Sequence, residues 1–388
     1  MKAVCWNGVN DLRVETVPDP KILNPHDAIF KVTLSSVCGS DLHLLDGFIP
    51  TMKPGDIIGH EFLGEVVEIG REVKDLRPGD RAIVISIIGC GQCFFCKNEL
   101  WSCCDNSNPK PDVTHWAFGK TPAGIFGYSH AFGGYAGSHA EYIRVPFADH
   151  GAIKVPDGVT DEQAVFVSDA APTGYMGADL ADIQPGDVVA VWGCGGVGQM
   201  AIRSAYLRGA ERVIAIDRFP DRLQMAAEKG GAEVLNYMET NVYEALEQMT
   251  GGRGPDRCIE AVGMEAHGTG PGHWYDTVAT NLYLETDRAT PLRQAILTCR
   301  KGGTVSVVGV YGLTDKFPMG AIVNKSLTLR SAQQHGQKYA RRLFEHIAKG
   351  ELDPSYLLTH RWPLERGPEG YQMFKHKVDN CMRVAFAP

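Results

Sequence analysis

The sequence predicts an α/β protein in which a β-rich domain accompanies a doubly wound domain built on a parallel sheet. The chain has 388 residues, which at about 150 residues per domain corresponds to two or three domains. Over the first 150 residues, short apolar stretches alternate with Gly, Pro and Asp turns, the usual pattern of β-structure. After Pro185-Gly186-Asp187, apolar runs alternate with helical segments, which is typical of a parallel sheet.

The expected elements follow from local composition. In the β-rich part, strands are expected at 62–69 and 82–87, with Pro78-Gly79-Asp80 as the turn between them. The run Val188–Trp192 is apolar throughout and predicts a strand buried on both faces. A helix is expected over 197–208, with Gly209 in the position that ends it. Further buried strands are expected at 213–216, 258–262, 304–308 and 327–329.

Charge and composition exclude several classes of protein. The chain has 38 Lys plus Arg against 46 Asp plus Glu, a net charge of −8, and therefore no general electrostatic reason to bind nucleic acid or an anionic membrane. No run reaches the ~18 apolar residues of a membrane span, and residues 1–15 lack the apolar core of a secretory signal. We expect a cytoplasmic protein with a small-molecule substrate, in a reducing compartment where clustered cysteines more often hold metal than disulfides.

A glycine-rich motif lies between the strand at 188–192 and the helix that follows. Gly193-Cys194-Gly195-Gly196-Val197-Gly198 matches G-x-G-x-x-G. Gly193 allows the tight turn, Gly195 the close approach of a pyrophosphate, and Gly198 close packing of the helix. Asp217, at the end of the next expected strand, is placed to bind the adenosine ribose hydroxyls and to repel a 2′-phosphate. The motif predicts a Rossmann-type site that prefers NAD to NADP, although Arg218 and Arg222 are compatible with some use of NADP.

Four closely spaced cysteines give the strongest signal in the chain. Cys90-x2-Cys93-x2-Cys96-x7-Cys104 can surround one tetrahedral ion and leave no open position, which predicts a structural zinc. An iron–sulfur cluster or disulfides are the alternatives, but the ferredoxin run C-x2-C-x2-C-x3-C-P is not met. Cys103 satisfies the spacing almost as well as Cys104.

A second set of metal-ligating side chains is scattered. It comprises Cys38, in Cys38-Gly39-Ser40-Asp41-Leu42-His43, then His60, in Gly59-His60-Glu61, and finally Asp169. Taken singly, each has an ordinary structural explanation, namely a buried thiol, a hydrogen-bonded core histidine and a helix N-cap.

Together, these motifs resemble, in kind and order, the zinc-containing medium-chain alcohol dehydrogenases over nearly the whole chain. The resemblance implies a GroES-like catalytic domain of residues 1–170 and 332–388, with a structural-zinc lobe at 88–105, beside a Rossmann NAD-binding domain at 171–331. It implies a catalytic zinc in the cleft between the domains, held by Cys38, His60 and Asp169, with an open position for water or substrate.

Asp169 indicates a branch of this family, because many members supply a cysteine as the third ligand. With Pro172-Thr173-Gly174-Tyr175, it resembles the glutathione-independent formaldehyde dehydrogenases and formaldehyde dismutases. The long segment 264–291 is a second mark of that branch, where a comparable insertion covers the adenine end of NAD. Since a carboxylate donates less electron density than a thiolate, the zinc is expected to be a stronger Lewis acid.

The resemblance also assigns roles around the zinc. Ser40 would take the proton from the substrate oxygen and pass it, through the nicotinamide ribose, to His43, whose unperturbed pKa of ~6.5 suits proton release. Asp41 would orient His60, and Glu61 would ligate zinc transiently during water exchange.

Further contacts are implied outside the zinc site. Arg383 is expected either to reach a cofactor phosphate or to be a solvated surface residue, and Ser86 is expected to line the substrate pocket. Cofactor contacts besides the glycines and Asp217 are implied at Val197, Arg222, Val262 and Val310.

The sequence therefore predicts a zinc- and NAD-dependent oxidoreductase that moves a hydride between a primary alcohol or hydrated aldehyde and NAD, with two zinc ions per chain. One alternative is an aldehyde dismutase, in which NAD stays bound while one aldehyde is oxidised and another reduced. A further alternative is a non-catalytic NAD(H)-binding protein on the same scaffold. The family resemblance implies a homotetramer or a homodimer.

Overall fold

The computed structural model describes residues 1–110, 113–265, 289–311 and 317–388. Most of the segment 264–291, expected to cover the cofactor, lies outside the described residues. The chain forms two compact units, Met1–Pro172 with Gln334–Pro388, and Thr173–Gln333. Among the described residues, no helix is long and apolar enough to cross a membrane.

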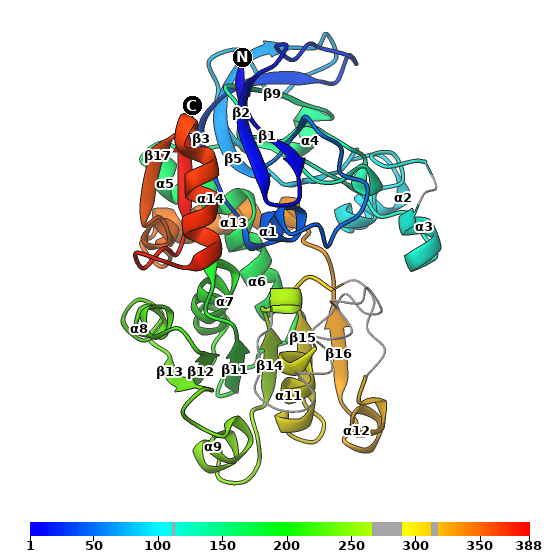
Figure 1. Ribbon diagram of the computed structural model, residues 1–388. Helices are drawn as coiled ribbons and strands as arrows, with labels where there is room; N and C mark the ends of the chain where they lie inside the picture. Colours follow the sequence, from blue (N-terminus) through cyan, green and yellow to red (C-terminus); the bar gives the residue numbers. More distant parts are fainter. Residues whose placement is uncertain (111–112, 266–288, 312–316) are drawn as a thin grey trace. The chain divides into compact units, whose positions relative to one another are not determined.

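The first unit contains a seven-stranded sheet in the order β10-β6-β5-β3-β18-β17, with β9 also paired to β3 (Figure 1). β18, from the end of the chain, pairs antiparallel with β3, so the C-terminal segment completes the sheet begun by the N-terminal part. A three-stranded sheet, β2-β1-β4, and the pair β7-β8 lie outside this sheet. The strands are β1 Lys2–Gly8, β2 Asp11–Thr16, β3 Ala28–Ser36, β4 Asp56–Ile57, β5 Glu61–Ile69, β6 Arg81–Val84, β7 Ile87–Ile88, β8 Gly124–Ile125, β9 Tyr142–Val145, β10 Ala152–Lys154, β17 His360–Pro363 and β18 Val384–Ala387.

Short helices connect these strands, and two longer ones come from the C-terminal segment. The short elements are α1 Gly39–Leu45, α2 Phe94–Lys97, η1 Trp101–Cys103, α3 Val113–Phe118, η2 His130–Phe132, α4 Ala148–Gly151, α5 Asp161–Ala164, η3 Val165–Ser168, η5 Pro354–Leu357 and η6 Leu364–Arg366. The longer ones are α13 Gly336–Ala348 and α14 Gly367–His376, and α6 Ala170–Leu180 runs from the first unit into the second.

The second unit is a six-stranded sheet in the order β13-β12-β11-β14-β15-β16. Every neighbouring pair is parallel. The strand order reverses between β11 and β14, and in doubly wound sheets ligands bind beyond the carboxyl ends of the strands at this point. The elements are β11 Val188–Trp192, α7 Gly196–Leu207, β12 Arg212–Asp217, α8 Pro220–Glu228, β13 Glu233–Asn236, α9 Val242–Met249, β14 Arg257–Glu260, η4 Gly263–Glu265, α11 Thr290–Thr298, β15 Thr304–Val307, α12 Met319–Asn324 and β16 Thr328–Ser331.

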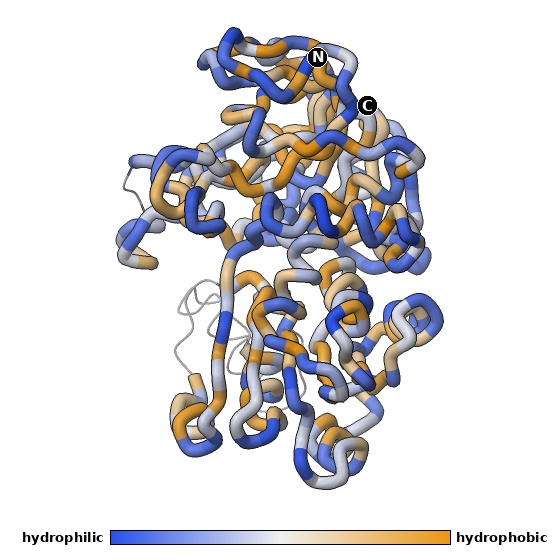
Figure 2. Tube along the Cα trace, turned by 180° about the vertical axis from the view of Figure 1, so that it is seen from behind, coloured by the Kyte–Doolittle hydropathy of each residue, from blue (hydrophilic) through white to orange (hydrophobic). Residues whose placement is uncertain are grey.

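The central strand β11 is buried at all five positions, as its composition predicts. Ala190 and Trp192 lie in a hydrophobic cluster with Leu246 of α9 and Ile296 of α11. Successive side chains of a strand point to opposite faces, so the intervening residues face the other side of the sheet. Figure 2 shows the hydrophobic and hydrophilic stretches interleaved along the chain, as expected when each element buries one side.

The fold class predicted from the sequence is confirmed, with three corrections to single strands. The strand expected at 82–87 is interrupted after Val84, because Ser86 turns its hydroxyl to a buried carboxylate. The strand expected at 258–262 ends at Glu260, whose carboxylate accepts the N–H groups of the next residues. The strand at 328–331 is exposed at every position rather than buried, since β16 is the edge of the sheet and pairs with β15.

The helix boundary at the glycine motif is close to the prediction. α7 ends at Leu207, and Gly209 has φ of +99°, the left-handed conformation that commonly ends a helix.

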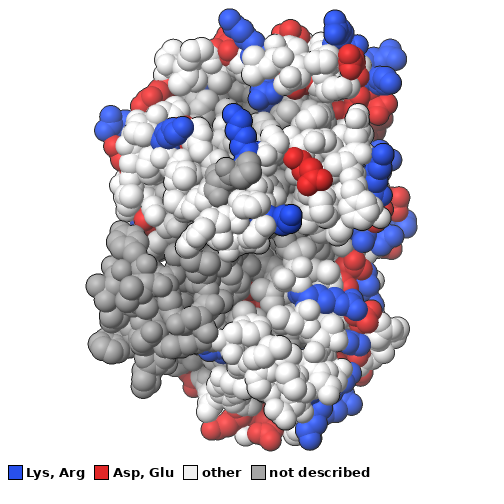
Figure 3. Space-filling view, turned by 90° about the vertical axis from the view of Figure 1, so that its right-hand side faces the viewer, with Lys and Arg blue, Asp and Glu red and all other residues white. Residues whose placement is uncertain are grey.

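On the molecular face in Figure 3, Lys and Arg side chains are intermingled with Asp and Glu side chains.

Candidate functional site

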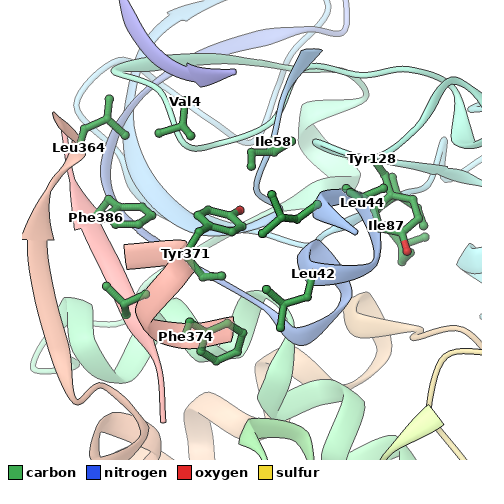
Figure 4. Close-up of a cluster of buried hydrophobic side chains, with 14 of the residues drawn as sticks. Val4, Leu42, Leu44, Ile58, Ile87, Tyr128, Leu364, Tyr371, Phe374 and Phe386 are labelled. Atoms are coloured by element: carbon green, nitrogen blue, oxygen red, sulfur yellow. The ribbon is translucent and has the colours of Figure 1, made fainter. Parts of the chain in front are cut away.

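Helix α1 carries several of the predicted site residues, and the hydrophobic core fixes its position. Cys38 is its N-cap, and Asp41 in the first turn accepts the Cys38 backbone N–H through Oδ2 at 2.8 Å. Leu42 and Leu44 on the same helix lie in a buried cluster with side chains of α14, among them Tyr371 and Phe374 (Figure 4). The C-terminal segment therefore helps to hold the helix that presents Cys38, Ser40 and His43.

Three of the scattered residues converge within the first unit. Cys38, His60 and Asp169 are buried, and one ligand atom from each lies within 4.8 Å of the others. Asp169 Oδ2 is 3.4 Å from Cys38 Sγ and 3.7 Å from His60 Nε2. Tetrahedral bonds of about 2.0 Å to N or O and 2.3 Å to S place ligand atoms about 3.3–3.5 Å apart. The set therefore fits one zinc ion with a fourth position left over.

The backbone beside His60 requires glycine. Gly59 has φ of +95°, and a Cβ there would lie 2.6 Å from the ring of His139. The ring of Tyr128 meets the His60 ring edge-on, with centroids 6.4 Å apart. His139 and Tyr128 thus pack around the turn and the imidazole, and both were absent from the sequence-based set because no motif marks them.

Asp41 contacts Nδ1 of His60, whereas Nε2 of the same ring faces the candidate metal position. Its Oδ1 is 3.1 Å from His60 Nδ1, the arrangement in which a carboxylate sets the tautomer and orientation of a metal-ligating histidine. Burial opposes a charge on His60, but Asp41 beside it raises the pKa of His60 well above its ordinary value. Without metal the imidazole therefore retains its proton, and binding of a metal at Nε2 would release it.

Ser40 and His43 lie on α1, one turn apart. Ser40 Oγ is 3.1 Å from His60 Nε2, the nitrogen that faces the candidate metal position. Residues three apart share one face of a helix, so His43 lies on the same side of α1, and its side chain is buried at 3% exposure. The structure brings Ser40 to the ligand set, whereas the relay onward to His43 stays a prediction.

Glu61 and Arg383 form a buried charged pair beside the ligand set. Arg383 Nη1 is 3.8 Å from Glu61 Oε2, and Arg383 Nη2 is 3.8 Å from Cys38 Sγ. Glu61 Oε1 accepts the N–H of Ala170, the neighbour of Asp169, at 2.9 Å. Burial raises the pKa of Glu61 to about 7, although Arg383 opposes this rise. The expectation that Arg383 is a solvated surface residue was wrong, because its side chain is 2% exposed and neutralises buried negative charge.

Ser86 and Gln334 contact Asp169 directly. Ser86 Oγ donates to Asp169 Oδ1 at 2.8 Å, and Gln334 Nε2 donates to the same oxygen and to Ser86 Oγ. The hydroxyl of Ser86 thus holds a candidate ligand, and its place in the lining of the substrate pocket stays a prediction. The sequence alone does not indicate Gln334, because it lies 165 residues from Asp169 along the chain and belongs to no recognisable motif.

The four cysteines of the predicted lobe also converge in the first unit. The thiol sulfurs of Cys90, Cys93, Cys96 and Cys104 all lie within 4.8 Å of one another. The sulfurs of Cys90 and Cys96 are 3.9 Å apart, close to the ~3.8 Å edge of a zinc tetrahedron with bonds of about 2.3 Å and far from a disulfide bond of about 2.05 Å. Cys104 is fully buried in this set, whereas the adjacent Cys103 is exposed.

Backbone and amide N–H groups point at the sulfur of Cys90. The N–H groups of Gln92 and Cys93 each lie 3.4 Å from Cys90 Sγ, and Asn106 Nδ2 lies 3.2 Å away. Burial alone would raise the pKa of Cys90, but these donors lower it to about 7. The loop thus favours a thiolate, the form in which cysteine binds zinc.

The glycine motif of the second unit has the geometry that its spacing predicts. Gly193 has φ of +91°, and Gly195 is the N-cap of α7. A Cβ at Gly198 would lie 1.8 Å from the carbonyl oxygen of Gly193, so only glycine allows the helix to approach the strand. The first turn of α7, including Gly196 and Val197, therefore begins at the carboxyl end of β11 with N–H groups available to an anion.

Asp217 ends β12 beside this turn. Its Oδ2 accepts the N–H of Cys194 at 2.7 Å and its Oδ1 accepts the N–H of Arg218 at 2.6 Å. The guanidinium groups of Arg218 and Arg222 lie over the ring of Phe219, at 4.6 and 5.1 Å from its centroid. Asp217 is thus hydrogen-bonded to the glycine turn, and Arg222 lies beside the same turn, since a Cβ at Gly195 would be 3.7 Å from Arg222 Nη1.

The remaining predicted cofactor contacts follow two neighbouring strands. Val262 comes after β14 and Val310 after β15, and Met264 N donates to Val310 O at 3.0 Å. Glu260 at the end of β14 is fully buried, and its Oε1 accepts the N–H groups of Val262 and Gly263, each at 2.9 Å. This carboxylate therefore fixes the loop that carries Val262.

Replacing Glu260 with glutamine is expected to stabilise the protein above pH 7 and to change little near pH 4.5. Burial raises the pKa of Glu260 to about 7, against an ordinary value of 4.5. Its stabilising contribution is thus fully present below pH 4.5 and is lost as the pH rises through 7, a loss of about 3 kcal/mol. Thermal unfolding of both proteins at pH 5 and pH 8 checks this; an equal change at both pH values would contradict it.

Comparison with known proteins identifies the family. Residues 24–157 match the alcohol dehydrogenase GroES-like domain, and residues 196–269 match the zinc-binding dehydrogenase domain. The first match contains Cys38, His60 and the four cysteines, and the second begins within the glycine turn, at Gly196. The chain belongs to the zinc-type medium-chain alcohol dehydrogenase family, and is an alcohol dehydrogenase-type oxidoreductase with GroES-like and Rossmann-like folds.

Individual relatives match along the whole chain. An uncharacterized zinc-type alcohol dehydrogenase-like protein of Bacillus subtilis is 40% identical over 100% of both chains. A formaldehyde dismutase of Pseudomonas putida is 31% identical over 96% of this chain and 94% of its own.

Solved structures of other proteins have the same fold as this chain. The alcohol dehydrogenase TADH of Thermus sp. ATN1 has a TM-score of 0.85 and 34% identity, covering 100% of this chain and 99% of its own. A putative zinc-binding dehydrogenase of Sinorhizobium meliloti, solved with NADP bound, has a TM-score of 0.78 and 25% identity, with coverage of 100% and 99%.

Proposed function

We propose that this chain oxidises a primary alcohol or hydrated aldehyde with NAD, at a zinc ion held by Cys38, His60 and Asp169. The observation that carries this proposal is the convergence of one thiol, one imidazole and one carboxylate, one ligand fewer than tetrahedral zinc takes. A structural ion would be enclosed by four protein ligands, whereas a catalytic zinc typically has three and an open position. The four-cysteine set supplies the enclosed type in the same chain.

The chain's own residues can bind the substrate oxygen and move its proton. When bound, zinc polarises the substrate oxygen and the nicotinamide accepts the hydride. Ser40 Oγ is 3.1 Å from the nitrogen of His60 that would face the metal, so its hydroxyl is placed to accept a proton from a substrate hydroxyl there. His43, one turn along α1, is the next group that can take that proton. Asp41 keeps the His60 ring in place throughout.

Two of the three ligands in this set are anionic when they bind a metal. The Cys38 thiolate and the Asp169 carboxylate together offset the two positive charges of the ion. Arg383 offsets the buried carboxylate of Glu61, at 3.8 Å. Because an unpaired buried charge is costly, two anionic ligands support a divalent cation as the intended occupant, while Asp41 stays hydrogen-bonded to the His60 ring.

Metal and nucleotide analysis of the purified protein test the proposal. We expect two zinc ions per chain and NAD-dependent turnover of at least one member of a panel of primary alcohols and aldehydes. A chain with one zinc and no turnover would contradict the proposal and favour the non-catalytic NAD(H)-binding alternative. The same panel with NADP measures how far Arg218 and Arg222 allow the second nucleotide, which is bound in the Sinorhizobium meliloti relative.

Dismutation of an aldehyde is the second candidate function. It is favoured by the 31% identity to the formaldehyde dismutase of Pseudomonas putida and by the carboxylate ligand Asp169. Gel filtration followed by denaturation distinguishes the two. Release of about one NAD(H) per chain, with equal yields of acid and alcohol from an aldehyde, favours the dismutase. A protein that releases no NAD(H) and binds added NAD reversibly favours the dehydrogenase.

Replacing Ser40 with alanine is expected to lower kcat about a hundredfold, because general acid–base groups typically contribute 10²–10⁴-fold. Binding of NAD, measured by titration, should be unchanged. Ser355→Ala is the control, since its hydroxyl lies in η5 and donates to Asp353 Oδ1 at 2.7 Å on the exposed surface. Full activity of Ser40→Ala would rule out the relay.

We also propose that the protein assembles as a homotetramer, in keeping with its family. Sedimentation equilibrium of the purified protein measures the assembly directly. A monomer or a dimer in solution would contradict this proposal without affecting the assignment of the zinc site.

A further inference from the structure

The two oxygens of the Asp169 carboxylate have different partners. Oδ1 accepts hydrogen bonds from Ser86 Oγ, at 2.8 Å, and from Gln334 Nε2. Oδ2 lies 3.4 Å from Cys38 Sγ and 3.7 Å from His60 Nε2. One oxygen is thus engaged by protein donors and the other faces the candidate metal position.

The two donors come from separate parts of the fold, and both are buried. Ser86 lies in the break between β6 and β7 and is 2% exposed, and Gln334 lies two residues before α13 and is 4% exposed. The backbone N–H groups at the break both donate hydrogen bonds, from Ile85 N to Gly151 O at 2.9 Å and from Ser86 N to Ser168 O at 3.3 Å. Ser86 is therefore tied through the backbone to the residue that precedes Asp169.

The start of α13 is packed closely against this break. A Cβ at Gly336 would lie 2.6 Å from Ile85 Cγ2 and 2.6 Å from Gln334 Oε1, so glycine is needed there. Gln334 turns its amide nitrogen to the carboxylate, since the amide oxygen in that position would face another acceptor. Its Oε1 is buried and has no hydrogen-bond partner among the described residues. Leaving a buried oxygen unpaired costs free energy, which the fold tolerates to bring a donor to Asp169.

We propose that Ser86 and Gln334 are positioning residues that make Asp169 coordinate zinc through Oδ2 alone. This inference rests on the proposed function, because it concerns the same zinc site. A carboxylate can bind a metal through one oxygen or both. With both, the protein would supply four ligand atoms and would occupy the position that a catalytic zinc keeps open for substrate. The two donors occupy Oδ1 and thereby preserve the open position.

The arrangement also explains why a thiolate would serve poorly at position 169. A cysteine has a single ligand atom, so it cannot bind the metal and present a separate carboxylate oxygen to Ser86 and Gln334. Those two buried donors would then lose their strongest acceptor. The aspartate and its two donors thus form one unit, and exchange of the ligand requires exchange of the donors.

Metal release from the zinc-loaded, full-length protein tests this proposal. Gln334→Met keeps the length of the side chain and removes its donor, and Ser86→Ala removes the hydroxyl. Hydrogen-bond partners of ligands typically contribute 10–100-fold to metal affinity. We therefore expect one of the two zinc ions to bind roughly 10- to 100-fold more weakly in each variant, while the four-cysteine ion is unchanged. Titration against a chromophoric chelator measures both affinities.

Gln337→Met is the matched control. Gln337 lies in the first turn of α13 and donates to the backbone oxygen of Ile87 at 2.9 Å, so this variant loses a hydrogen bond at the same interface without touching Asp169. Both zinc affinities should stay at the wild-type value. Equal weakening in this control would overturn the proposal, since the effect would then arise from a loosened α13.

Cobalt exchanged into the Cys38, His60 and Asp169 site reports coordination independently of activity. Four-coordinate Co²⁺ absorbs visible light more intensely than five-coordinate Co²⁺. We expect a four-coordinate spectrum for the wild type and Gln337→Met. We expect weaker absorption for Gln334→Met and Ser86→Ala, because Oδ1 then keeps only one of its two donors and can bind the ion as well. If Gln334→Met fails to fold, Ser86→Ala decides the outcome alone.

The failures of the two proposals are distinguishable. Two zinc ions in the wild type, with wild-type affinity and spectrum in both Gln334→Met and Ser86→Ala, would overturn only the positioning role. A wild type that holds zinc at the four cysteines alone would overturn the proposed function and, with it, this inference.

Discussion

Replacing Asp169 with alanine is expected to lower kcat/KM by about a thousandfold or more, while the protein remains folded. The change removes one of three zinc ligands and leaves Ser86 and Gln334 without their shared acceptor. Lewis-acid catalysis by zinc supplies several kcal/mol of transition-state stabilisation, enough to change the rate by several factors of ten. Metal analysis should show one zinc per chain instead of two, because the four-cysteine set is untouched.

Asp161→Ala is the matched control for this variant. Asp161 lies in α5, eight residues before Asp169, and its carboxylate pairs with Arg81 Nε at 2.7 Å on a partly exposed surface. The control should retain both zinc ions and its activity. An Asp169→Ala protein with two zinc ions and wild-type kcat/KM would show that the carboxylate is not a ligand.

Asp169→Cys examines the electronic effect of the same ligand. If the carboxylate makes zinc a stronger Lewis acid than a thiolate would, the cysteine variant should need a higher pH to reach its maximal rate. An unchanged pH–rate profile, measured on a variant that retains two zinc ions, would remove the Lewis-acid hypothesis. Loss of the second zinc in this variant would instead show that Ser86 and Gln334 require a carboxylate.

The sequence predicts the second unit well because its signals are local. Val188–Trp192, the glycine turn and Asp217 follow one another closely along the chain, and each has a steric or electrostatic reason that acts over a few residues. The β14 boundary was missed, since the strand ends where Glu260 accepts the N–H groups of Val262 and Gly263. That hydrogen bonding is not visible in hydropathy.

The two metal-ligand sets differ in how well the sequence alone predicts them. Spacing by itself points to the four cysteines, because they follow one another within a single short segment. Cys38 and Asp169 are 131 residues apart, and only the family resemblance grouped them with His60 before the structure placed all three together. Gln334 and Arg383 come from the C-terminal segment and reach Asp169 and Glu61 through tertiary packing, so no local pattern marks them.

Replacing Cys104 with serine is expected to destabilise the first unit strongly, whereas replacing the adjacent Cys103 should have little effect. Cys104 is fully buried in the four-cysteine set, and Cys103 is exposed outside it. A structural zinc contributes folding free energy directly. If the loss of one thiolate costs about 5 kcal/mol, the Tm should fall by roughly 10–20 °C. Thermal unfolding and metal analysis of the two serine variants measure this difference.

The effect of Cys104→Ser should extend to the catalytic ligands. In η1, next to Cys104, Ser102 N donates to His335 Nδ1 at 3.4 Å, and His335 directly follows Gln334. Burial lowers the pKa of His335 to about 4, which keeps its ring neutral and able to accept this bond. Loss of the lobe would therefore loosen the segment that holds Gln334 against Asp169. We expect Cys104→Ser protein kept below its Tm to release the catalytic zinc faster than Cys103→Ser, and equal release from the two would show that the lobe stabilises the fold without supporting the active site.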